Sequence, residues 1–242
     1  MASIPKKRFS VVIPVFNHEA KVIDVVRETL KLGLPLFIVD DGSTDATYTK
    51  LTGVKGIHLL RHRVNRGKGA AIMTGFNEAV KVSDWAITLD ADGQHNPQDA
   101  WGMITAIPDD QRPIVIGWRN GMDDSHVHWT SRFGRKFSNF WVWFSGGPKA
   151  SDTQSGFRIY PLPESLNIKV KARRFQFEVE ILVKAAWRGI PVLEVPIGVS
   201  YHPGNGRISH FRPFIDFIRN TRTFSRLIVQ RIFFPLSVRR HW

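Results

Sequence analysis

The N-terminal half of the chain alternates short apolar runs with amphipathic stretches, and this alternation limits the possible folds more than any other feature. The apolar runs are residues 9–16, 36–39, 56–60 and 85–89. Apolar side chains between them recur at three- and four-residue steps, at Val22, Val25, Val26 and Leu30 and again at Ile72, Phe76, Ala79 and Val80. This spacing predicts helices, the first beginning at Asn17 or His18 and ending at Gly33. The order predicts an α/β fold with a mostly parallel central sheet flanked by helices.

Polar clusters follow three of the apolar runs, at residues 14–18, 40–45 and 90–95. Because ligands of open parallel sheets bind beyond the carboxyl ends of the strands, we expect these clusters to converge on one site. Asp90 and Asp92 are one residue apart and repel each other unless a cation or solvent lies between them. Mg²⁺ commonly takes one or two carboxylates plus substrate phosphates. The clusters therefore predict a nucleotide-and-metal site, although Asp90–Gly93 alone would also fit a solvated turn.

A glycine-rich segment, Asn65-Arg66-Gly67-Lys68-Gly69, precedes the third helix. It is either a tight turn or a helix N-terminus that places Lys68 near phosphate. No GxGxxG motif follows the first strand and no Walker A sequence is present, so neither of those nucleotide-binding signatures applies.

Further short motifs continue the series in order. The complete series is Ile13-Pro14-Val15-Phe16-Asn17, Val39-Asp40-Asp41-Gly42-Ser43-Thr44-Asp45, Asn65–Gly69, Asp90-Ala91-Asp92-Gly93-Gln94-His95, Gly117-Trp118-Arg119, Asp152-Thr153-Gln154-Ser155-Gly156-Phe157-Arg158 and Phe177-Glu178-Val179-Glu180-Ile181. Over about residues 9–210, the chain resembles family 2 glycosyltransferases, and in particular the dolichyl-/polyprenyl-phosphate sugar synthase branch. The resemblance implies a GT-A domain over residues 1–210, a GDP- or UDP-sugar donor, Mg²⁺ or Mn²⁺, and inversion at the anomeric carbon.

The resemblance also implies roles by position. Pro14, Phe16 and His18 would line the nucleoside, and Asp40 and Asp41 would contact base or ribose. Asp90, Asp92 and Gln94 would hold the metal, and Arg119 would lie by the phosphates or the acceptor. Further candidates for binding the phosphates or the acceptor are Lys68, Ala91, Arg135 and Arg207. Two departures concern the acceptor. Arg135 stands where the branch usually has Ser, and the late Arg-x-x-Gly-x-Ser-Lys element is rewritten as residues 204–210. We expect Arg207 to replace the missing cations there.

The acceptor decides whether the reaction needs a protein base. A departing nucleoside diphosphate needs positive charge, which the metal at Asp90 and Asp92 and the side chain of Arg119 would supply. A lipid or glycan hydroxyl must also lose its proton to a carboxylate, whereas a lipid phosphate is already ionised and instead needs cations. Arg132, Arg135 and Lys136 offer such cations, unless they form a solvated helix face.

Three carboxylates are candidate bases: Asp152, Glu178 and Glu180. The two glutamates lie two residues apart on a helix predicted over residues 177–187, so they cannot share a face. We expect one to point into the site while the other is solvated. A turn cap at Asp152 and ion pairs at the glutamates are the structural alternatives.

Composition bears on partners and compartment. The formal net charge is +13, which favours polyanionic partners, but no zinc pattern or RNA-binding aromatic motif points to nucleic acid. The chain has no Cys, which suits a reducing compartment. Residues 211–242 combine many arginines with apolar residues at helical spacing. This pattern predicts a basic amphipathic helical extension that lies on a membrane surface or packs on the core or a neighbouring subunit.

The sequence contains no uninterrupted stretch of about 18 apolar residues, so we expect no helix that spans a membrane. The sequence therefore predicts a cytoplasmic enzyme that associates peripherally with the cytoplasmic face of a membrane, alone, as a homo-oligomer or through a membrane partner. The leading hypothesis is sugar transfer to polyprenyl phosphate. Transfer to a hydroxyl acceptor, or a nucleic-acid-binding role, are the alternatives.

Overall fold

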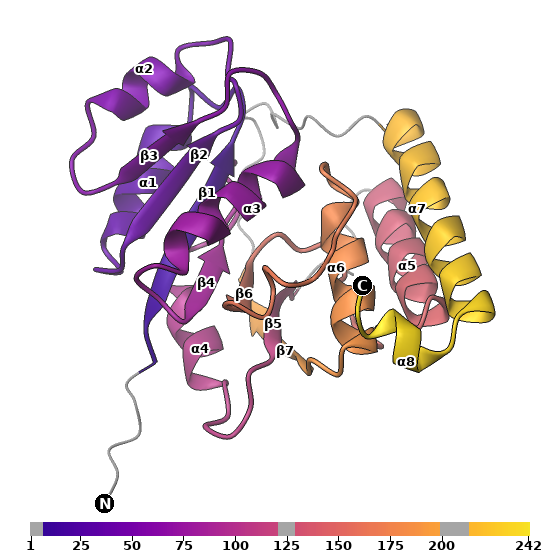
Figure 1. Ribbon diagram of the computed structural model, residues 1–242. Helices are drawn as coiled ribbons and strands as arrows, with labels where there is room; N and C mark the ends of the chain where they lie inside the picture. Colours follow the sequence, from indigo (N-terminus) through magenta and orange to yellow (C-terminus); the bar gives the residue numbers. More distant parts are fainter. Residues whose placement is uncertain (1–6, 121–128, 199–212) are drawn as a thin grey trace, which may run out of the picture.

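A computed structural model describes residues 7–120, 129–198 and 213–242, with side chains described from residues 132 and 218 onward in the last two segments (Figure 1). The strands are β1 (Phe9–Val15), β2 (Leu36–Asp40), β3 (His58–Arg61), β4 (Trp85–Thr88), β5 (Ile114–Arg119), β6 (Arg158–Pro161) and β7 (Val192–Ile197). The helices are α1 (Val22–Leu30), α2 (Thr47–Thr52), α3 (Lys68–Ala79), α4 (Asp99–Thr105), α5 (Trp129–Phe144), α6 (Phe177–Trp187), α7 (Pro213–Phe233) and α8 (Leu236–Arg239).

In the described part of the chain the strands form one 7-stranded sheet in the order β3-β2-β1-β4-β6-β5-β7. β6 runs antiparallel to β4 and β5, and the other neighbouring pairs are parallel. The predicted mostly parallel α/β architecture is confirmed. Because β6 is reversed, it begins at the edge where β4 and β5 end, with Arg158 opposite Thr88 and Ile116. The loop that leads into β6 therefore reaches the same edge as the polar clusters.

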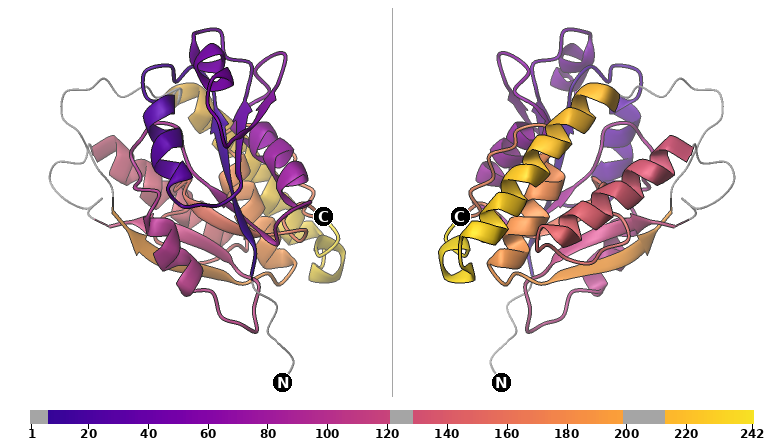
Figure 2. Two further views of the ribbon diagram at one scale, coloured as in Figure 1. Left: turned by 90° about the vertical axis from the view of Figure 1, so that its left-hand side faces the viewer. Right: turned by 90° about the vertical axis from the view of Figure 1, so that its right-hand side faces the viewer.

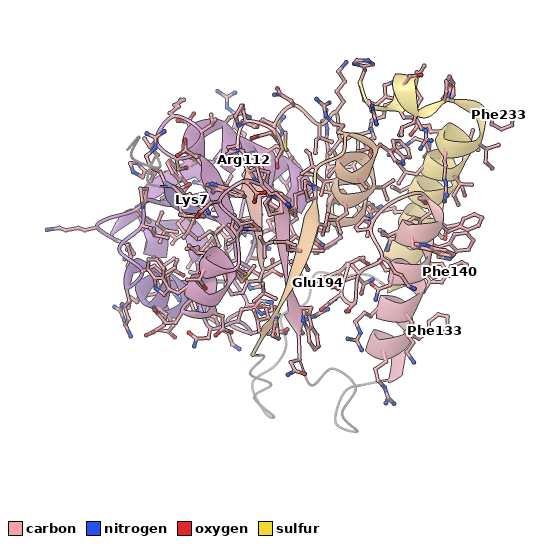
Figure 3. All side chains as sticks on the ribbon, turned by 90° about the horizontal axis from the view of Figure 1, so that it is seen from below. Lys7, Arg112, Phe133, Phe140, Glu194 and Phe233 are labelled. Atoms are coloured by element: carbon pink, nitrogen blue, oxygen red, sulfur yellow. The ribbon has the colours of Figure 1, made fainter. Side chains whose placement is uncertain are left out.

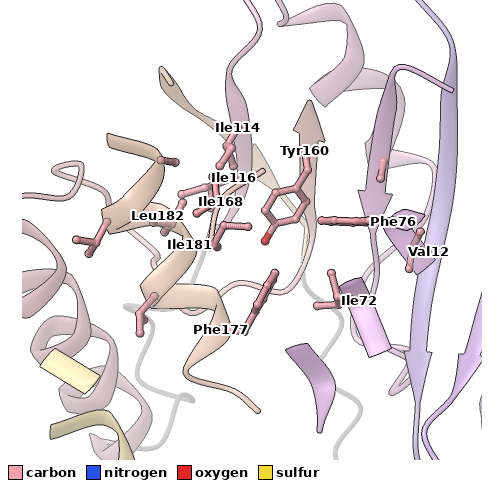
Figure 4. Close-up of a cluster of buried hydrophobic side chains, with 14 of the residues drawn as sticks. Val12, Ile72, Phe76, Ile114, Ile116, Tyr160, Ile168, Phe177, Ile181 and Leu182 are labelled. Carbon is pink, nitrogen blue, oxygen red and sulfur yellow. The ribbon is translucent and has the colours of Figure 1, made fainter. Parts of the chain in front are cut away.

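Two buried clusters fill the two faces of the sheet. The first contains apolar side chains from α3, α6 and α7, and the second contains side chains from α1 and α4. Figure 4 shows part of the first cluster, where the rings of Phe76 and Tyr160 pack with their centroids 5.0 Å apart. Gly75 brings α3 close to the sheet, because a Cβ at this position would overlap the side chain of Val12.

The first helix begins later than the sequence predicts, at Val22 rather than at Asn17 or His18. Asn17 has a φ of 52°, outside the helical range, and its carboxamide accepts the Thr44 N–H at 2.8 Å. Hydrogen bonds to the neighbouring loop thus replace the first helical turn. The C-terminal end is close to the predicted one. The helix ends at Leu30, three residues before Gly33, which has a φ of 65°.

The C-terminal helix α7 lies beside α5 and α6 (Figures 1 and 2). Phe224 and Leu227 are 2% and 0% exposed and belong to the same buried cluster as Ile181 of α6. Part of the predicted apolar stripe therefore packs on the core, although Ile218 and Ile232 of the same helix are exposed. None of the helices in the described residues is long and apolar enough to cross a membrane.

Candidate active site

The loops that follow β1 and β2 are tied together at the carboxyl edge of the sheet. The backbone N–H of Asn17 donates to Ser43 Oγ at 3.0 Å, and the backbone N–H of His18 donates to Thr47 Oγ1 at 2.8 Å. Pro14 is buried within β1, while Phe16 and His18 are half-buried just beyond it. The three residues predicted to line a nucleoside therefore lie at the end of one central strand.

Asp40 and Asp41 are buried and support the loops around them. Asp40 Oδ1 accepts the Ser43 N–H at 3.1 Å. Asp41 accepts the backbone N–H groups of Arg66 and Gly67 at 2.9 and 2.7 Å, and its Oδ1 lies 2.7 Å from His62 Nδ1. Asp41 thus fixes the glycine-rich loop at the start of α3. Its carboxylate oxygens are already engaged in this structure.

Lys68, the first residue of α3, bridges two carboxylates from distant parts of the chain. Its Nζ lies 2.6 Å from Asp90 Oδ1 and 2.5 Å from Glu178 Oε1. Burial alone would lower the pKa of Lys68, but the two carboxylates outweigh it and raise the pKa above its ordinary value. Burial likewise opposes ionisation of Asp90, yet the adjacent Lys68 holds the pKa of that carboxyl below its usual range. Each shift favours the charged form of its group, so Lys68 and Asp90 form an ion pair at neutral pH.

Gly156 permits this close approach. A Cβ at this position would overlap Asp90 Oδ2 and come within 2.7 Å of Lys68 Nζ. Its carbonyl also accepts the Thr88 hydroxyl at 2.8 Å, which joins the loop before β6 to the end of β4. A side chain at position 156 would therefore separate the Lys68–Asp90 pair.

The segment that follows β4 offers the predicted metal ligands. Ala91 is buried, whereas Asp92 and Gln94 are half-buried. Asp92 Oδ1 accepts the Gln94 N–H at 3.0 Å, and this bond closes the turn. His95 Nδ1 is buried without a hydrogen-bond partner. Burial lowers the pKa of His95, although Asp90 and Asp92 lie near enough to oppose the shift.

The oxygen atoms of Asp90, Asp92 and Gln94 fit Mg²⁺ or Mn²⁺, which prefer carboxylate and amide oxygens. Within residues 7–120, 129–198 and 213–242, no three acidic, histidine or cysteine side chains gather as a ready-made metal cage. A cation at Asp90 and Asp92 would thus need further oxygens from Gln94, water or a bound diphosphate.

Arg119, at the end of β5, pairs with Asp152 in the loop before β6. Its Nε and Nη2 donate to the two carboxylate oxygens at 2.7 and 3.0 Å. Burial alone would raise the pKa of Asp152, which is 0% exposed, but the bond from Arg119 and the nearby charge of Arg135 lower it. Arg135 is itself buried on α5, so it does not form part of a solvated helix face. The three side chains form a second charged cluster at this edge.

The two glutamates of α6 point to different partners, as the helical spacing predicts. Glu178 reaches Lys68, whereas Glu180 lies 3.0 Å from Lys184 Nζ and 2.6 Å from Arg226 Nη2. The expectation that one of them is solvated is wrong, because Glu178 is 6% and Glu180 0% exposed. The cause is α7, which covers the far side of α6 and brings Arg226 with it.

Arg158 has a positioning role that the sequence analysis missed. It is fully buried, and its guanidinium donates to the carbonyls of Thr153, Ser155 and Glu178 at 2.7, 2.7 and 2.8 Å. It therefore holds the loop before β6 against the start of α6. A single arginine within the apolar run Phe157-Arg158-Ile159-Tyr160 was the available signal, because a buried charge requires partners.

The sequence predictions for Arg207 and for the rewritten element at residues 204–210 lie outside the described residues. The remaining predicted site residues lie at or beside one sheet edge, which carries one charged cluster around Lys68 and another around Arg119.

Comparison with known proteins agrees with this geometry. Residues 10–162 match the family model "Glycosyl transferase family 2". An uncharacterized protein of Methanocaldococcus jannaschii is 32% identical over 205 residues, covering 82% of this chain and 84% of that protein. A UDP-N-acetylglucosamine–dolichyl-phosphate N-acetylglucosaminyltransferase of Methanococcus voltae is 29% identical over 217 residues, covering 81% and 86%.

Among solved structures, glucosyl-3-phosphoglycerate synthase from Mycobacterium tuberculosis in complex with Mg²⁺ and UDP superposes with a TM-score of 0.66 at 19% identity, covering 95% of this chain and 81% of that one. This likeness shows a shared GT-A fold. Because the family model matches more than half of the chain and the sheet edge carries the motifs of the family in one place, the chain belongs to glycosyl transferase family 2 and is a glycosyltransferase.

Proposed function

We propose that the protein is a metal-dependent inverting glycosyltransferase that moves a sugar from a UDP- or GDP-sugar to polyprenyl phosphate, a dolichyl-type acceptor. The relative from Methanococcus voltae, whose name specifies a UDP-sugar donor and dolichyl phosphate, supports both substrate classes. In this proposal the enzyme works peripherally at the cytoplasmic face of a membrane, where a lipid-linked acceptor is accessible.

On the donor side, Pro14, Phe16 and His18 would line the nucleoside. Asp90 and Asp92, with Gln94, would hold Mg²⁺ or Mn²⁺, which neutralises charge on the departing diphosphate when bound. Lys68 would add a fixed positive charge at the N-terminus of α3, where backbone N–H groups also favour phosphate. Arg119 would do the same from the end of β5.

The acceptor class is argued from the three candidate bases, all of which are already paired with cations. Glu180 is held by Lys184 and Arg226. Asp152 is held by two hydrogen bonds from Arg119, and Glu178 lies 2.5 Å from Lys68 Nζ. The bonds from Arg119 lower the pKa of Asp152, and a carboxylate with a lowered pKa accepts a proton poorly. An acceptor that is already ionised needs no such base, and cations such as Arg119 and Arg135 suit its charge.

The test uses purified full-length protein with UDP- and GDP-sugars, offered polyprenyl phosphate or the matching polyprenol, with Mn²⁺ or with a chelator. We expect transfer from one nucleotide class to the phosphate only, and only with the metal. Equal transfer to the polyprenol would favour the hydroxyl-acceptor alternative.

Asp92→Ala tests the metal role. The substitution should abolish transfer and leave the thermal unfolding transition in place, because Asp92 is half-buried at a turn. Asp110→Ala removes an exposed carboxylate elsewhere and serves as the matched control. Full activity of Asp92→Ala would show that its carboxylate is not a required ligand.

A further inference from the structure

Helix α5 packs one polar side against the loop before β6 and exposes several of its aromatic side chains. Arg135 and Ser138 are 6% and 1% exposed, and Asn139 hydrogen-bonds to Ser151 and Thr153 of the loop before β6. On other faces of the same helix, Phe133 is 60% and Phe140 50% exposed. A surface helix in water normally turns its apolar face inward. α5 does pack apolar side chains on the core, among them Val142 at 0% exposed, but it also carries this second, exposed aromatic face.

The exposed apolar surface continues from α5 onto the C-terminal helices. We call it the α5–α7–α8 face, made of Phe133, Phe140, Trp143, Phe144, Ile218, Val229, Ile232, Phe233, Phe234, Leu236 and Val238. Of the exposed large apolar residues in the described chain, only Val64, Val82 and Trp101 lie elsewhere. Figure 3 shows Phe133, Phe140 and Phe233 projecting away from the body of the protein on the same side.

Hydrogen bonds hold α5 and α7 together as one surface. The Arg231 guanidinium donates to the carbonyls of Phe144 and Trp143 at the C-terminus of α5. A cation there also compensates the negative end of the helix dipole. The apolar side chains of the two helices are therefore presented together. An exposed apolar surface of this kind marks an interaction site.

The charge of the face selects its partner. The sequence has no Asp or Glu over residues 129–144 or 219–242. Lys136, Arg222 and Arg240 are exposed on these segments. A second copy docked through this face would bring like charges together, whereas an anionic lipid surface offers both opposite charge and an apolar layer.

We propose that the α5–α7–α8 face docks on the surface of an anionic bilayer, with its aromatic side chains inserted at the level of the headgroups. The purpose of this docking rests on the proposed lipid-linked acceptor. α5 then separates two environments, because Arg135 lies by the Arg119–Asp152 pair while Phe140 faces lipid. An acceptor phosphate that leaves the bilayer beside α5 meets the charged cluster directly.

The first test contains neither donor nor acceptor, so its outcome is independent of the proposed reaction. Full-length protein is mixed with vesicles of phosphatidylcholine alone or with added phosphatidylglycerol, and bound protein is measured by flotation. We expect binding to the anionic vesicles, weakened by high salt. The double variant Phe140→Ser/Phe233→Ser should lower the partition coefficient by about tenfold or more.

Trp101→Ser is the matched control, since it removes an exposed aromatic side chain on α4 and should leave vesicle binding unchanged. The substituted side chains are half or more exposed, so thermal unfolding and nucleotide-sugar binding should stay at wild-type values. Wild-type levels of vesicle binding by the double variant would overturn the proposal. So would a wild-type dimer in solution that the double variant converts to a monomer, because a second copy would then cover the face.

A second double variant separates the contribution of charge to vesicle binding from the contribution of apolar insertion. Lys136→Gln/Arg222→Gln should lower binding to anionic vesicles and leave the weak binding to neutral vesicles unchanged. Equal binding of the wild-type protein to both vesicle types would contradict the assignment to an anionic surface.

Discussion

The Arg119–Asp152 pair gives the sharpest test of how the charged edge is built. Asp152 is 0% exposed and Arg119 13% exposed at the side chain, and two guanidinium N–H groups donate to the two carboxylate oxygens. Asp152→Asn keeps the shape of the side chain but removes its charge. The carboxamide can accept only through its oxygen, so its NH₂ group would face one of the Arg119 donors.

The magnitude follows from burial. Breaking a buried ion pair by changing one partner typically costs about 3–5 kcal/mol. Since Arg119 retains slight exposure and one acceptor remains, we expect Asp152→Asn to lower the free energy of unfolding by about 2–4 kcal/mol at neutral pH. Urea unfolding followed by tryptophan fluorescence measures this difference.

The pH dependence has a definite sign. The pKa of Asp152 is lowered in the folded protein, because Arg119 outweighs the effect of burial. The pair therefore stabilises the protein above the ordinary aspartate pKa of about 4, and its contribution is lost as the pH falls through the lower folded pKa. The unfolding free energies of wild type and Asp152→Asn should converge in acid.

A surface pair with the same geometry provides the control. Arg8 donates from Nε and Nη2 to Asp84 at 3.1 and 2.9 Å, but both side chains are exposed. Asp84→Asn should unfold at nearly the wild-type urea concentration, because exposed ion pairs contribute little. If Asp152→Asn were no more destabilising than Asp84→Asn, or if its effect persisted unchanged in acid, burial of the pair would not be the source of its stability.

Three further substitutions test the surrounding structure. Lys68→Met leaves Asp90 and Glu178 facing each other without a cation, so it should lower stability at neutral pH. It should also weaken nucleotide-sugar binding in a thermal-shift assay. Adding Glu178→Gln to this variant should restore part of the stability. Gly75→Ala should destabilise by about 1–3 kcal/mol in urea unfolding, because the new methyl overlaps Val12. Arg226→Gln should cost about 1–3 kcal/mol in the same assay by removing one of two cations at buried Glu180, whereas the exposed Arg222→Gln should not.

The sheet and its functional edge could be predicted because their signals are local. Three of the four apolar runs end in a polar cluster, and parallel strands bring such clusters to one edge. The helix over residues 177–187 was predicted with its observed bounds. Local sequence patterns did not indicate that β6 runs antiparallel to its neighbours. Its reversal brings Asp152 and Gly156 to the edge, and this depends on pairing between segments far apart in sequence.

Partners of buried charges were also beyond reach of the sequence. Glu178 pairs with Lys68, which lies over a hundred positions away in the sequence, and Glu180 pairs with Arg226 of α7. Local spacing showed that the two glutamates diverge but not what each one meets. The apolar residues on every side of α6 were the signal that both glutamates are buried, because a helix that is hydrophobic all round lies inside the protein.

The contacts of Glu180 connect the C-terminal helix α7 to the cluster around Lys68. Besides Arg226 and Lys184, Glu180 accepts the N–H groups of Lys171 and Ala172 at 3.1 and 2.9 Å. The next residue, Arg173, accepts the Ala70 N–H at 3.0 Å through its carbonyl.

That bond lies in the first turn of α3, two residues beyond Lys68, and a Cβ on Gly69 would overlap Phe177 at the start of α6. The loop that seats Lys68 is therefore held by a glutamate that α7 helps to neutralise. A chain ending at residue 210 would leave Glu180 with Lys184 as its remaining cation among the described residues. It would also lack Phe224 and Leu227, and so would expose the part of the core that these two side chains cover. The helix predicted as an extension thus supports the position of Lys68, in addition to the membrane docking that we propose for it.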